Sequence, residues 1–417
     1  MKYDVATNFD EELINYIKEI DSNHEIVSLY GKLKYDCVGG GRPADMLNEI
    51  NMDYLESYNR KCNDLGIEFN YLLNPLCLGG KDVNSKEHFE IIHLIEELKS
   101  RGITAVTVNS PYLCEIIKEQ FPNIKVTIGI YAGINSLMKV KQWVALGADG
   151  LTLVHDINRN FKLLEHILEY LKGKGVFIRL IANNGCLHQC PFEINHGATI
   201  SHVSVKNKTS EYYVDYSLIN CYYRRIKYIS NLISSDWIRP EDIHVYEEVC
   251  EKVGNKNLVI KLVERTKTTD YLKNVIKAYL SRQYEGNLND LLNWPNQLQT
   301  PSNPNGFLNG ISDGDINLKI ISKYFASFNI PVPYIDNNKL DGFINHFIMN
   351  YNCNDKLCWN GEDVDILDEK SNYCKYCYNW AKKVVVIPDE NKYQDWIKNN
   401  EELMQGMVTS EIFKGMK

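Results

Sequence analysis

The sequence feature that most limits the fold is a series of eight short apolar runs that alternate with amphipathic stretches. Most of the runs are followed by a segment whose apolar residues recur at helical spacing. Eight strand–helix units are typical of an α/β fold, the closed (β/α)8 TIM-type barrel. The predicted strands are residues 3–6, 26–31, 67–74, 103–109, 124–132, 150–156, 175–183 and 257–264.

A doubly wound open sheet is the alternative to a barrel. It would use fewer strands and would place a glycine-rich turn after the first strand. Residues 7–12 of this chain read TNFDEE instead. The sequence therefore favours the barrel.

Two segments depart from the alternation of strands and helices. About seventy residues separate the seventh run from the eighth, and insertions of that length in a compact fold are usually functional. After the eighth run and its helix, the chain becomes rich in turns and then in cysteines. We predict a barrel of residues 1–285 with an insertion at residues 184–240 before strand eight. Residues 286–417 would form a small cysteine-rich C-terminal extension.

The composition narrows the class of protein. Hydrophobic residues make up 44% of the chain and charged residues 24%, a balance typical of a globular protein with a sizeable core. The formal net charge of −8 argues against a basic face for nucleic acid. Neither a signal peptide nor an apolar run of about 18 residues is present. We therefore expect a cytoplasmic protein that binds neither membranes nor nucleic acid.

Polar residues stand at the end of nearly every predicted strand. In a barrel of this kind the carboxyl ends of the strands form one face, where active sites lie. Polar groups repeated at so many strand ends would be costly in a packed core, so they predict a polar pocket. The residues are Thr7, Asn8, Cys37, Asn74, Asn109, His155, Asp156, Asn183, Asn184, Glu264 and Arg265. Within this set we expect Asn74, Asn109, His155 and Asn183 to contact substrate.

Four cysteines fall at the same predicted face. Cys186 and Cys190 follow the seventh run in the stretch NNGCLHQCPF, Cys37 follows the second run, and Cys221 lies in the insertion. Clustered cysteines in a chain without an export signal point to metal rather than disulfides. Four thiolates suit zinc and an iron–sulfur cluster equally by count. The alternative is that Cys186 and Cys190 alone bind a metal.

The C-terminal extension contains a second set of cysteines with the form C-x4-C-x15-C-x2-C. Two close pairs separated by a loop are a strong ligand signal for zinc or a [4Fe–4S] cluster. Because the segment is small, the metal would supply much of its folding energy. The predicted ligands are Cys353, Cys358, Cys374 and Cys377.

Histidines near the first set of cysteines allow other chemistry. His188 and His196 could tune a metal site, move protons or serve as the base of a nucleophilic Cys–His pair. A metal-dependent peptidase would require a motif such as HExxH on a helix, and this motif does not occur in the sequence. The residues themselves therefore argue against proteolysis.

One part of the sequence resembles a known family. The run DWIRPEDIHVYEEV at residues 236–249, followed by NLVIKLVERTKTTDYLKNVIKAYLSRQ, is similar to the signature of the collagenase-like U-32 peptidase family. In that family a helix precedes a strand ending in Glu-Arg or Glu-x-Arg, and a second helix follows. The likeness covers residues 1–290 in layout and is specific between residues 181 and 287.

The resemblance implies an enzyme with a [4Fe–4S] cluster that performs oxygen-independent hydroxylation or a related transfer. It matches Cys186, Cys190 and Cys221 to the cysteine-bearing region and Cys37 to a ligand position of one branch. The C-x3-C spacing departs from the commonest family pattern and leaves the fourth ligand in doubt.

The family motif also matches Glu264 and Arg265. Arg265, with Arg42 as a second candidate, would hold a substrate carboxylate. His188 or His196 would move protons. The expected substrate is a small molecule or peptide. A metal-dependent peptidase and a non-catalytic subunit that holds clusters for a partner enzyme remain alternatives, and an electron donor or partner subunit is a possible partner.

Overall fold

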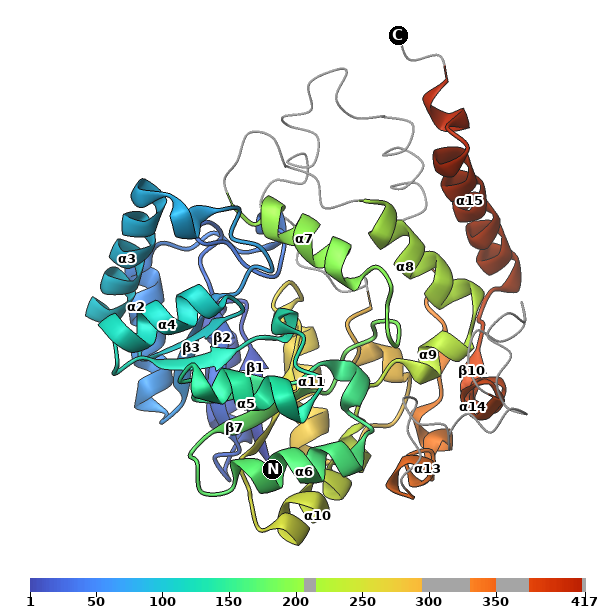
Figure 1. Ribbon diagram of the computed structural model, residues 1–417. Helices are drawn as coiled ribbons and strands as arrows, with labels where there is room; N and C mark the ends of the chain where they lie inside the picture. The colour runs from blue at the N-terminus through green and yellow to red at the C-terminus, as the bar shows by residue number, and fades with distance from the viewer. Residues whose placement is uncertain (206–214, 295–330, 350–374, 415–417) are drawn as a thin grey trace.

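The computed structural model describes residues 1–205, 215–294, 331–349 and 375–414 (Figure 1). Eight parallel strands form a closed barrel in sequence order, so the predicted (β/α)8 fold is confirmed. The last strand pairs with the first, with Tyr3 opposite Ile260. The strands are β1 (Lys2–Ala6), β2 (Ile26–Gly31), β3 (Glu68–Leu73), β4 (Ala105–Val108), β5 (Lys125–Ile128), β6 (Gly150–Thr152), β7 (Phe177–Ile181) and β8 (Leu258–Leu262).

Helices enclose the barrel because each presents an apolar stripe to the strands. In α6, for example, Leu164, Ile167, Leu168 and Leu171 recur at helical spacing and all are buried. The outer helices are α1 (Glu11–Ile20), α2 (Met52–Asp64), α3 (Ser85–Ser100), α4 (Pro111–Gln120), α5 (Leu137–Ala145), α6 (Phe161–Leu171), α10 (Ile243–Val253) and α11 (Thr269–Ser281). Short 3-10 turns lie at η1 (Ala44–Met46), η2 (Lys81–Val83), η3 (Ile130–Ala132) and η4 (His155–Ile157).

Charged side chains meet where the barrel closes. Asp4 of β1 is fully buried, and its Oδ2 lies 3.1 Å from Nε of Arg179 in β7 and 3.4 Å from Nζ of Lys261 in β8. Buried charges require such partners because desolvation is expensive. The three side chains therefore connect the strands on both sides of the closure.

Two strands end earlier than the apolar runs predicted. The run at residues 124–132 is a strand only to Ile128, and the run at 150–156 only to Thr152. In both places the chain turns into a 3-10 helix, η3 or η4. Apolar character continues past the strand because these turns are also packed against the core. The early end of β6 places His155 in a turn at the barrel mouth.

The insertion before β8 folds into helices over the mouth. It consists of the cysteine-bearing loop, α7 (Glu193–Val203), α8 (Tyr216–Lys227), α9 (Ser230–Ser234) and η5 (Pro240–Asp242). In Figure 1, α7 and α8 lie across one end of the barrel. Asp215 caps α8 by accepting a hydrogen bond from the Leu218 backbone N–H.

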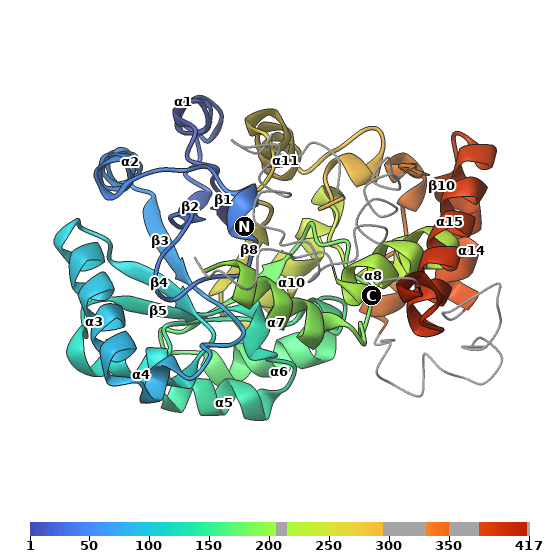
Figure 2. The same ribbon diagram turned by 90° about the horizontal axis from the view of Figure 1, so that it is seen from above.

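The C-terminal extension packs against the insertion. The α14 helix contacts α9, and α15 lies beside α8 in both views (Figure 2). The hydroxyl of Tyr393 in α15 donates to the Ile226 carbonyl of α8 at 2.5 Å. The elements here are η6 (Leu288–Asp290), β9 (Tyr334–Ile335), η7 (Asn337–Leu340), α13 (Asn345–Ile348), α14 (Lys375–Val384), β10 (Val385–Val386), α15 (Glu390–Val408) and η8 (Glu411–Phe413).

Within the described ranges of the chain, every helix is too short or too polar to cross a lipid bilayer.

Candidate functional site

A cavity of about 230 Å³ lies at the barrel mouth, between the ends of the strands and the insertion. Its walls come from the loop after β2, the end of β8, the cysteine-bearing loop, α7 and α8. The polar residues that line it are Arg42, Tyr131, His155, Asn184, Cys186, Cys190, Glu193, His196, Cys221, Glu264, Thr266, Lys267 and Asn293.

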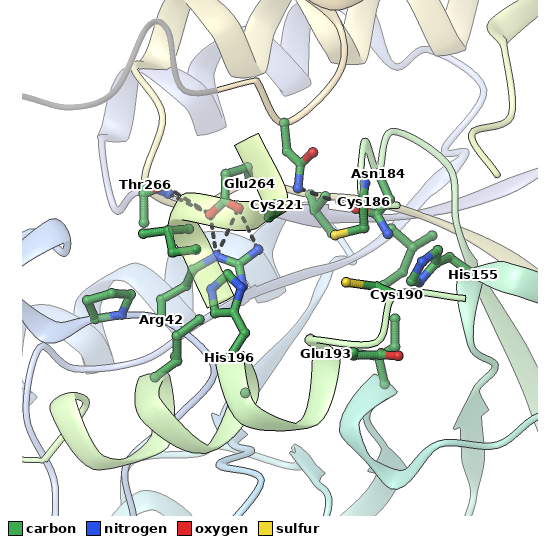
Figure 3. Close-up of a pocket in the computed structure, with 18 of the residues that line it drawn as sticks. Arg42, His155, Asn184, Cys186, Cys190, Glu193, His196, Cys221, Glu264 and Thr266 are labelled. Carbon is green, nitrogen blue, oxygen red and sulfur yellow. Dashed lines mark hydrogen bonds and ion pairs between the residues drawn. The ribbon is translucent and has the colours of Figure 1, made fainter. Parts of the chain in front are cut away.

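Three of the predicted thiols line this cavity. Cys186 and Cys190 come from the loop between β7 and α7, and Cys221 comes from α8. Figure 3 shows the sulfur atoms of Cys186 and Cys190 facing Arg42 and His196 across the pocket. Burial raises the pKa of all three thiols, to about 11 for Cys190 and about 12 for Cys221. Protonated thiols are poor nucleophiles, which argues against a Cys–His nucleophilic pair.

A buried arginine stands beside the thiols. Arg225 lies one helical turn after Cys221 in α8, and its charge opposes the effect of burial on the pKa of both Cys186 and Cys221. Its guanidinium lies 4.4 Å from the ring centre of Trp294. A Cβ added at Gly185 would lie 2.4 Å from the Arg225 Nη2, so a larger residue there would require the guanidinium to move. Arg225 therefore supplies positive charge next to the sulfur atoms.

The opposite wall is an ion pair. The Arg42 Nε donates to both carboxylate oxygens of Glu264, at 2.7 and 2.8 Å, and Nη2 donates to the same carboxylate. The remaining nitrogen, Nη1, donates to the Gly41 carbonyl. Burial alone would raise the pKa of Glu264, but Arg42 lowers it to about 2. Arg42, predicted to hold a substrate carboxylate, thus already holds a carboxylate of the protein.

Arg265 lines a smaller cavity of about 80 Å³ inside the barrel top. Asn74, Tyr30, Thr107 and Lys261 also line it. Burial lowers the pKa of Arg265 to about 10 and that of Lys261 to about 7. Burial thus favours the uncharged form of Lys261, which also lies 3.4 Å from Asp4, and Glu264 lines the same cavity, so Arg265 is the main cationic group that could attract an anion there.

Burial shifts the pKa values of two groups of the larger cavity toward their neutral forms. Burial lowers the pKa of His196 and raises that of Glu193. Both shifts favour the neutral forms, so one group is a base and the other an acid. Lys267, whose pKa burial lowers to about 8, lies in the same wall. The sequence analysis did not identify Glu193, Lys267 or Arg225, although Glu193 directly follows the CPF of the cysteine loop.

His188 does not line the cavity. Its Nδ1 lies 2.6 Å from the Asp236 Oδ2, and both side chains are buried. Gln189, the next residue, adopts a left-handed φ of 46° and donates its N–H to Asp156. The hydrogen bonds of His188 and Gln189 thus hold the loop between Cys186 and Cys190 in place.

Cys37 also lies outside the cavity. Asp36 accepts hydrogen bonds from the N–H groups of Val38 and Gly39, which winds the loop after β2 tightly. The Cys37 carbonyl accepts a hydrogen bond from Lys81 of η2, so this segment is held toward α3. Cys37 is half-buried there, and it is not among the thiols that meet at the mouth.

Two of the predicted substrate-binding asparagines connect parts of the backbone. The Asn183 amide donates to the Val263 and Leu291 carbonyls, and Asn183 is fully buried. Asn109 donates to the Asn74 carbonyl at 2.6 Å. A polar residue at a strand end can form hydrogen bonds with neighbouring loops or with a ligand. Its position after a strand does not show which of the two it does.

The predicted second metal site falls mainly outside the described residues. Cys353, Cys358 and Cys374 lie in the undescribed ranges, and Cys377 is buried in α14.

Comparison with known proteins places the chain among related sequences. No model of a known protein family matches it. The uncharacterized protease MJ1657 of Methanocaldococcus jannaschii is 28% identical over 349 residues, which cover 84% of this chain and 87% of the relative. The solved structure of the U32 peptidase Mk0906 is similar over 63% of this chain and 93% of its own, with a TM-score of 0.45 and 14% identity. An O-GlcNAc hydrolase of Thermobaculum terrenum aligns over 98% of this chain and 81% of its own, with a TM-score of 0.37 and 11% identity.

The closed parallel barrel with a polar cavity at the carboxyl ends of its strands is the architecture of an enzyme. The sequence resembles the collagenase-like U-32 peptidase family, and the relative that matches 84% of this chain is named a protease.

Proposed function

We propose that this protein is an iron–sulfur enzyme that modifies a small molecule or peptide by oxygen-independent hydroxylation or a related transfer. The observation that carries the proposal is the meeting of Cys186, Cys190 and Cys221 around one cavity. These thiols come from a loop and a helix more than thirty positions apart in the chain. Such convergence is expected of a ligand set for a soft metal.

The surroundings fit a [4Fe–4S] cluster held by these three cysteines. Burial keeps the thiols protonated in the absence of metal, and coordination deprotonates a thiol outright. The resulting negative charge would lie beside Arg225, whose approach depends on Gly185. When bound, the cluster supplies electrons and, at an iron without a protein thiolate, a position for a substrate oxygen.

The chain's own residues would bind substrate and move protons. Arg265 in the smaller cavity would bind an anionic group of the substrate. His196 would accept a proton and Glu193 would donate one on the cluster side of the cavity. The Arg42–Glu264 pair would form a fixed wall that orients the substrate.

Proteolysis is the second candidate, because the relative from Methanocaldococcus jannaschii is named a protease. A non-catalytic subunit that holds clusters for a partner enzyme is the third. Metal content separates the first candidate from the second. Turnover by the purified chain alone separates an enzyme from a subunit.

The test is the iron, acid-labile sulfide and zinc content of anaerobically purified protein. Wild type should contain about four iron atoms per chain at the barrel site. Four more iron atoms with sulfide would indicate a second cluster on the cysteines of the extension. Cys186→Ala should lose the four barrel irons, whereas the exposed control Cys77→Ala should keep them.

Cys37→Ala decides whether a fourth cysteine takes part. We expect this variant to retain the barrel iron, because Cys37 lies outside the cavity. Wild-type protein without iron would refute the proposal and bring the peptidase candidate forward.

A further inference from the structure

A group of metal-binding side chains lies behind the cysteine loop. Asp156 from η4, His188 from the loop and Asp236 from the segment after α9 each direct one ligand atom to a common point. These three atoms all lie within 4.8 Å of one another. His188 and Asp236 are buried, and the side chain of Asp156 is 17% exposed.

A fourth side chain is directed at the same group. His155 is 3% exposed, and neither of its ring nitrogens has a hydrogen-bond partner. Its Nε2 lies 3.2 Å from the Asp156 Oδ1. A buried imidazole without a hydrogen bond costs free energy unless something else binds it. His155 therefore adds a buried imidazole next to Asp156, at the edge of the Asp–His–Asp group and of the larger cavity.

The separations are close to those of a four-coordinate site. With bonds of about 2.0–2.2 Å, neighbouring ligand atoms in a tetrahedron are about 3.4 Å apart. The His188 Nδ1 lies 2.6 Å from Asp236 and 3.9 Å from Asp156, and the His155–Asp156 separation is 3.2 Å. The three atoms of Asp156, His188 and Asp236 are thus close enough to share one ion, whereas His155 lies outside this group of three and would have to move toward it on binding.

The local charge also favours a cation. Two carboxylates share this largely buried space, and the nearest fixed cation is Arg159. Its guanidinium donates to the carbonyls of Ile233, Ser235 and Trp237 and lies over the Trp237 ring at 4.5 Å. Arg159 thus influences Asp236 only through space. A dication would offset both carboxylates directly.

We propose that Asp156, His188, Asp236 and His155 bind one divalent transition-metal ion. Two imidazole nitrogens and two carboxylate oxygens suit Zn²⁺, Fe²⁺ or Mn²⁺, whereas the thiols of the cavity suit a softer metal. The site goes beyond the proposed iron–sulfur function and does not depend on it. Because His188 lies between Cys186 and Cys190, the ion would also fix the position of the cysteine loop.

The test uses Mn²⁺ as the probe, added to the full chain after treatment with a chelator. Free Mn²⁺ has a strong paramagnetic resonance signal that disappears on binding, so the signal gives the stoichiometry. Wild type should bind one equivalent, and Zn²⁺ should displace it. Asp156→Asn and His155→Ala should each bind Mn²⁺ at least tenfold more weakly.

Matched variants separate this site from the thiols and from general effects. Asp290→Asn changes a half-buried carboxylate outside the group and should bind Mn²⁺ like wild type. Cys186→Ala should lose the barrel iron but retain the Mn²⁺ equivalent. Failure of the iron measurement would therefore leave this result unaffected.

Two outcomes would overturn the proposal: no Mn²⁺ or Zn²⁺ bound by wild type, or Mn²⁺ binding that is lost in Cys186→Ala and unchanged in Asp156→Asn. Thermal unfolding gives a second readout. An excess of Mn²⁺, which thiols bind poorly, should raise the Tm of wild type and leave that of Asp156→Asn unchanged. Since two different ligand variants are used, misfolding of one does not remove the test.

Discussion

The two sides of the barrel mouth differ in how their polar groups are satisfied. On the side formed by the loop after β2 and the end of β8, all three donor nitrogens of Arg42 are bonded to Glu264 or to backbone. On the side formed by the insertion, buried thiols and an imidazole without hydrogen bonds surround the cavity. On the first side the polar groups have partners within the protein. On the second side the arrangement leaves groups to which a ligand could bind.

The two sides of the mouth therefore contribute differently to the stability of the fold and to ligand binding. A satisfied ion pair contributes to the fold whether or not a ligand is present. A buried imidazole without such partners costs stability until a metal or substrate binds it. Substitutions on the two sides should therefore affect different measurements.

Glu264→Gln should have the largest effect on stability. It leaves the Arg42 guanidinium without its carboxylate in a largely buried position, which costs about 3 kcal/mol. Urea unfolding of the protein measures this loss. Glu68→Gln is the control, since its exposed pair with Lys125 should contribute less than about 1 kcal/mol. Equal effects of the two variants would show that the first side of the mouth is not a stabilising unit.

The same pair should appear in the pH dependence of stability. The pKa of Glu264 is lowered from 4.5 to about 2 in the folded protein. A lowered carboxyl pKa stabilises the fold above the unfolded-state value and loses this effect as the pH falls through the folded value. Wild type should therefore lose stability relative to Glu264→Gln between pH 4.5 and pH 2. Parallel acid-unfolding curves would contradict this prediction.

Gly185→Ala tests the insertion side. The new Cβ would meet the Arg225 Nη2 at 2.4 Å and push the guanidinium away from the thiols. We expect a stability cost of about 1–3 kcal/mol from overpacking, with faster loss of iron under air. Gly406→Ala in α15 has its nearest contact at 3.5 Å and should be neutral or stabilising. Iron retention equal to wild type in Gly185→Ala would separate Arg225 from the metal site.

Tyr393→Phe should have a smaller effect on the same side. It removes the hydrogen bond from α15 to the Ile226 carbonyl of α8, worth about 1 kcal/mol. Because α8 carries Cys221, thiol reactivity with a labelling reagent should increase in metal-free protein. Glu401→Gln weakens the hydrogen bonds that Tyr223 and Lys227 of α8 donate to α15, and it should change the labelling rate in the same direction. An unchanged labelling rate in Tyr393→Phe would mean that α15 does not restrain α8.

Much of the fold could be predicted from the sequence because strand and helix periodicity are local properties. All eight barrel strands lie within the predicted runs or differ from them by one residue at an end, as in β1. The errors were at the ends of β5 and β6, where apolar residues belong to packed turns. An apolar run indicates that a segment packs against the core. It does not show whether the segment is a strand or a turn.

Less of the candidate site than of the fold could be predicted from the sequence. Position after a strand places a residue at the mouth, but loop hydrogen bonds decide its direction, as Asp36 does for Cys37. Asn183 likewise donates to the carbonyls of Val263 and Leu291, which follow β8 and η6, and no local sequence pattern reveals this contact between distant segments. The sequence did not mark Arg225 as a site residue, because an arginine in a helix is ordinarily solvated. Its role depends on Gly185, forty positions earlier.

The contact between α15 and α8 has a consequence for biosynthesis. Tyr393 is 167 positions beyond Ile226 in the chain. At roughly 5–20 residues per second, α15 would emerge from the ribosome about ten to thirty seconds after the segment with the cysteines. During that interval α8 lacks the hydrogen bond from Tyr393, so the packing of the helix that carries Cys221 is completed only after nearly the whole chain has been synthesised.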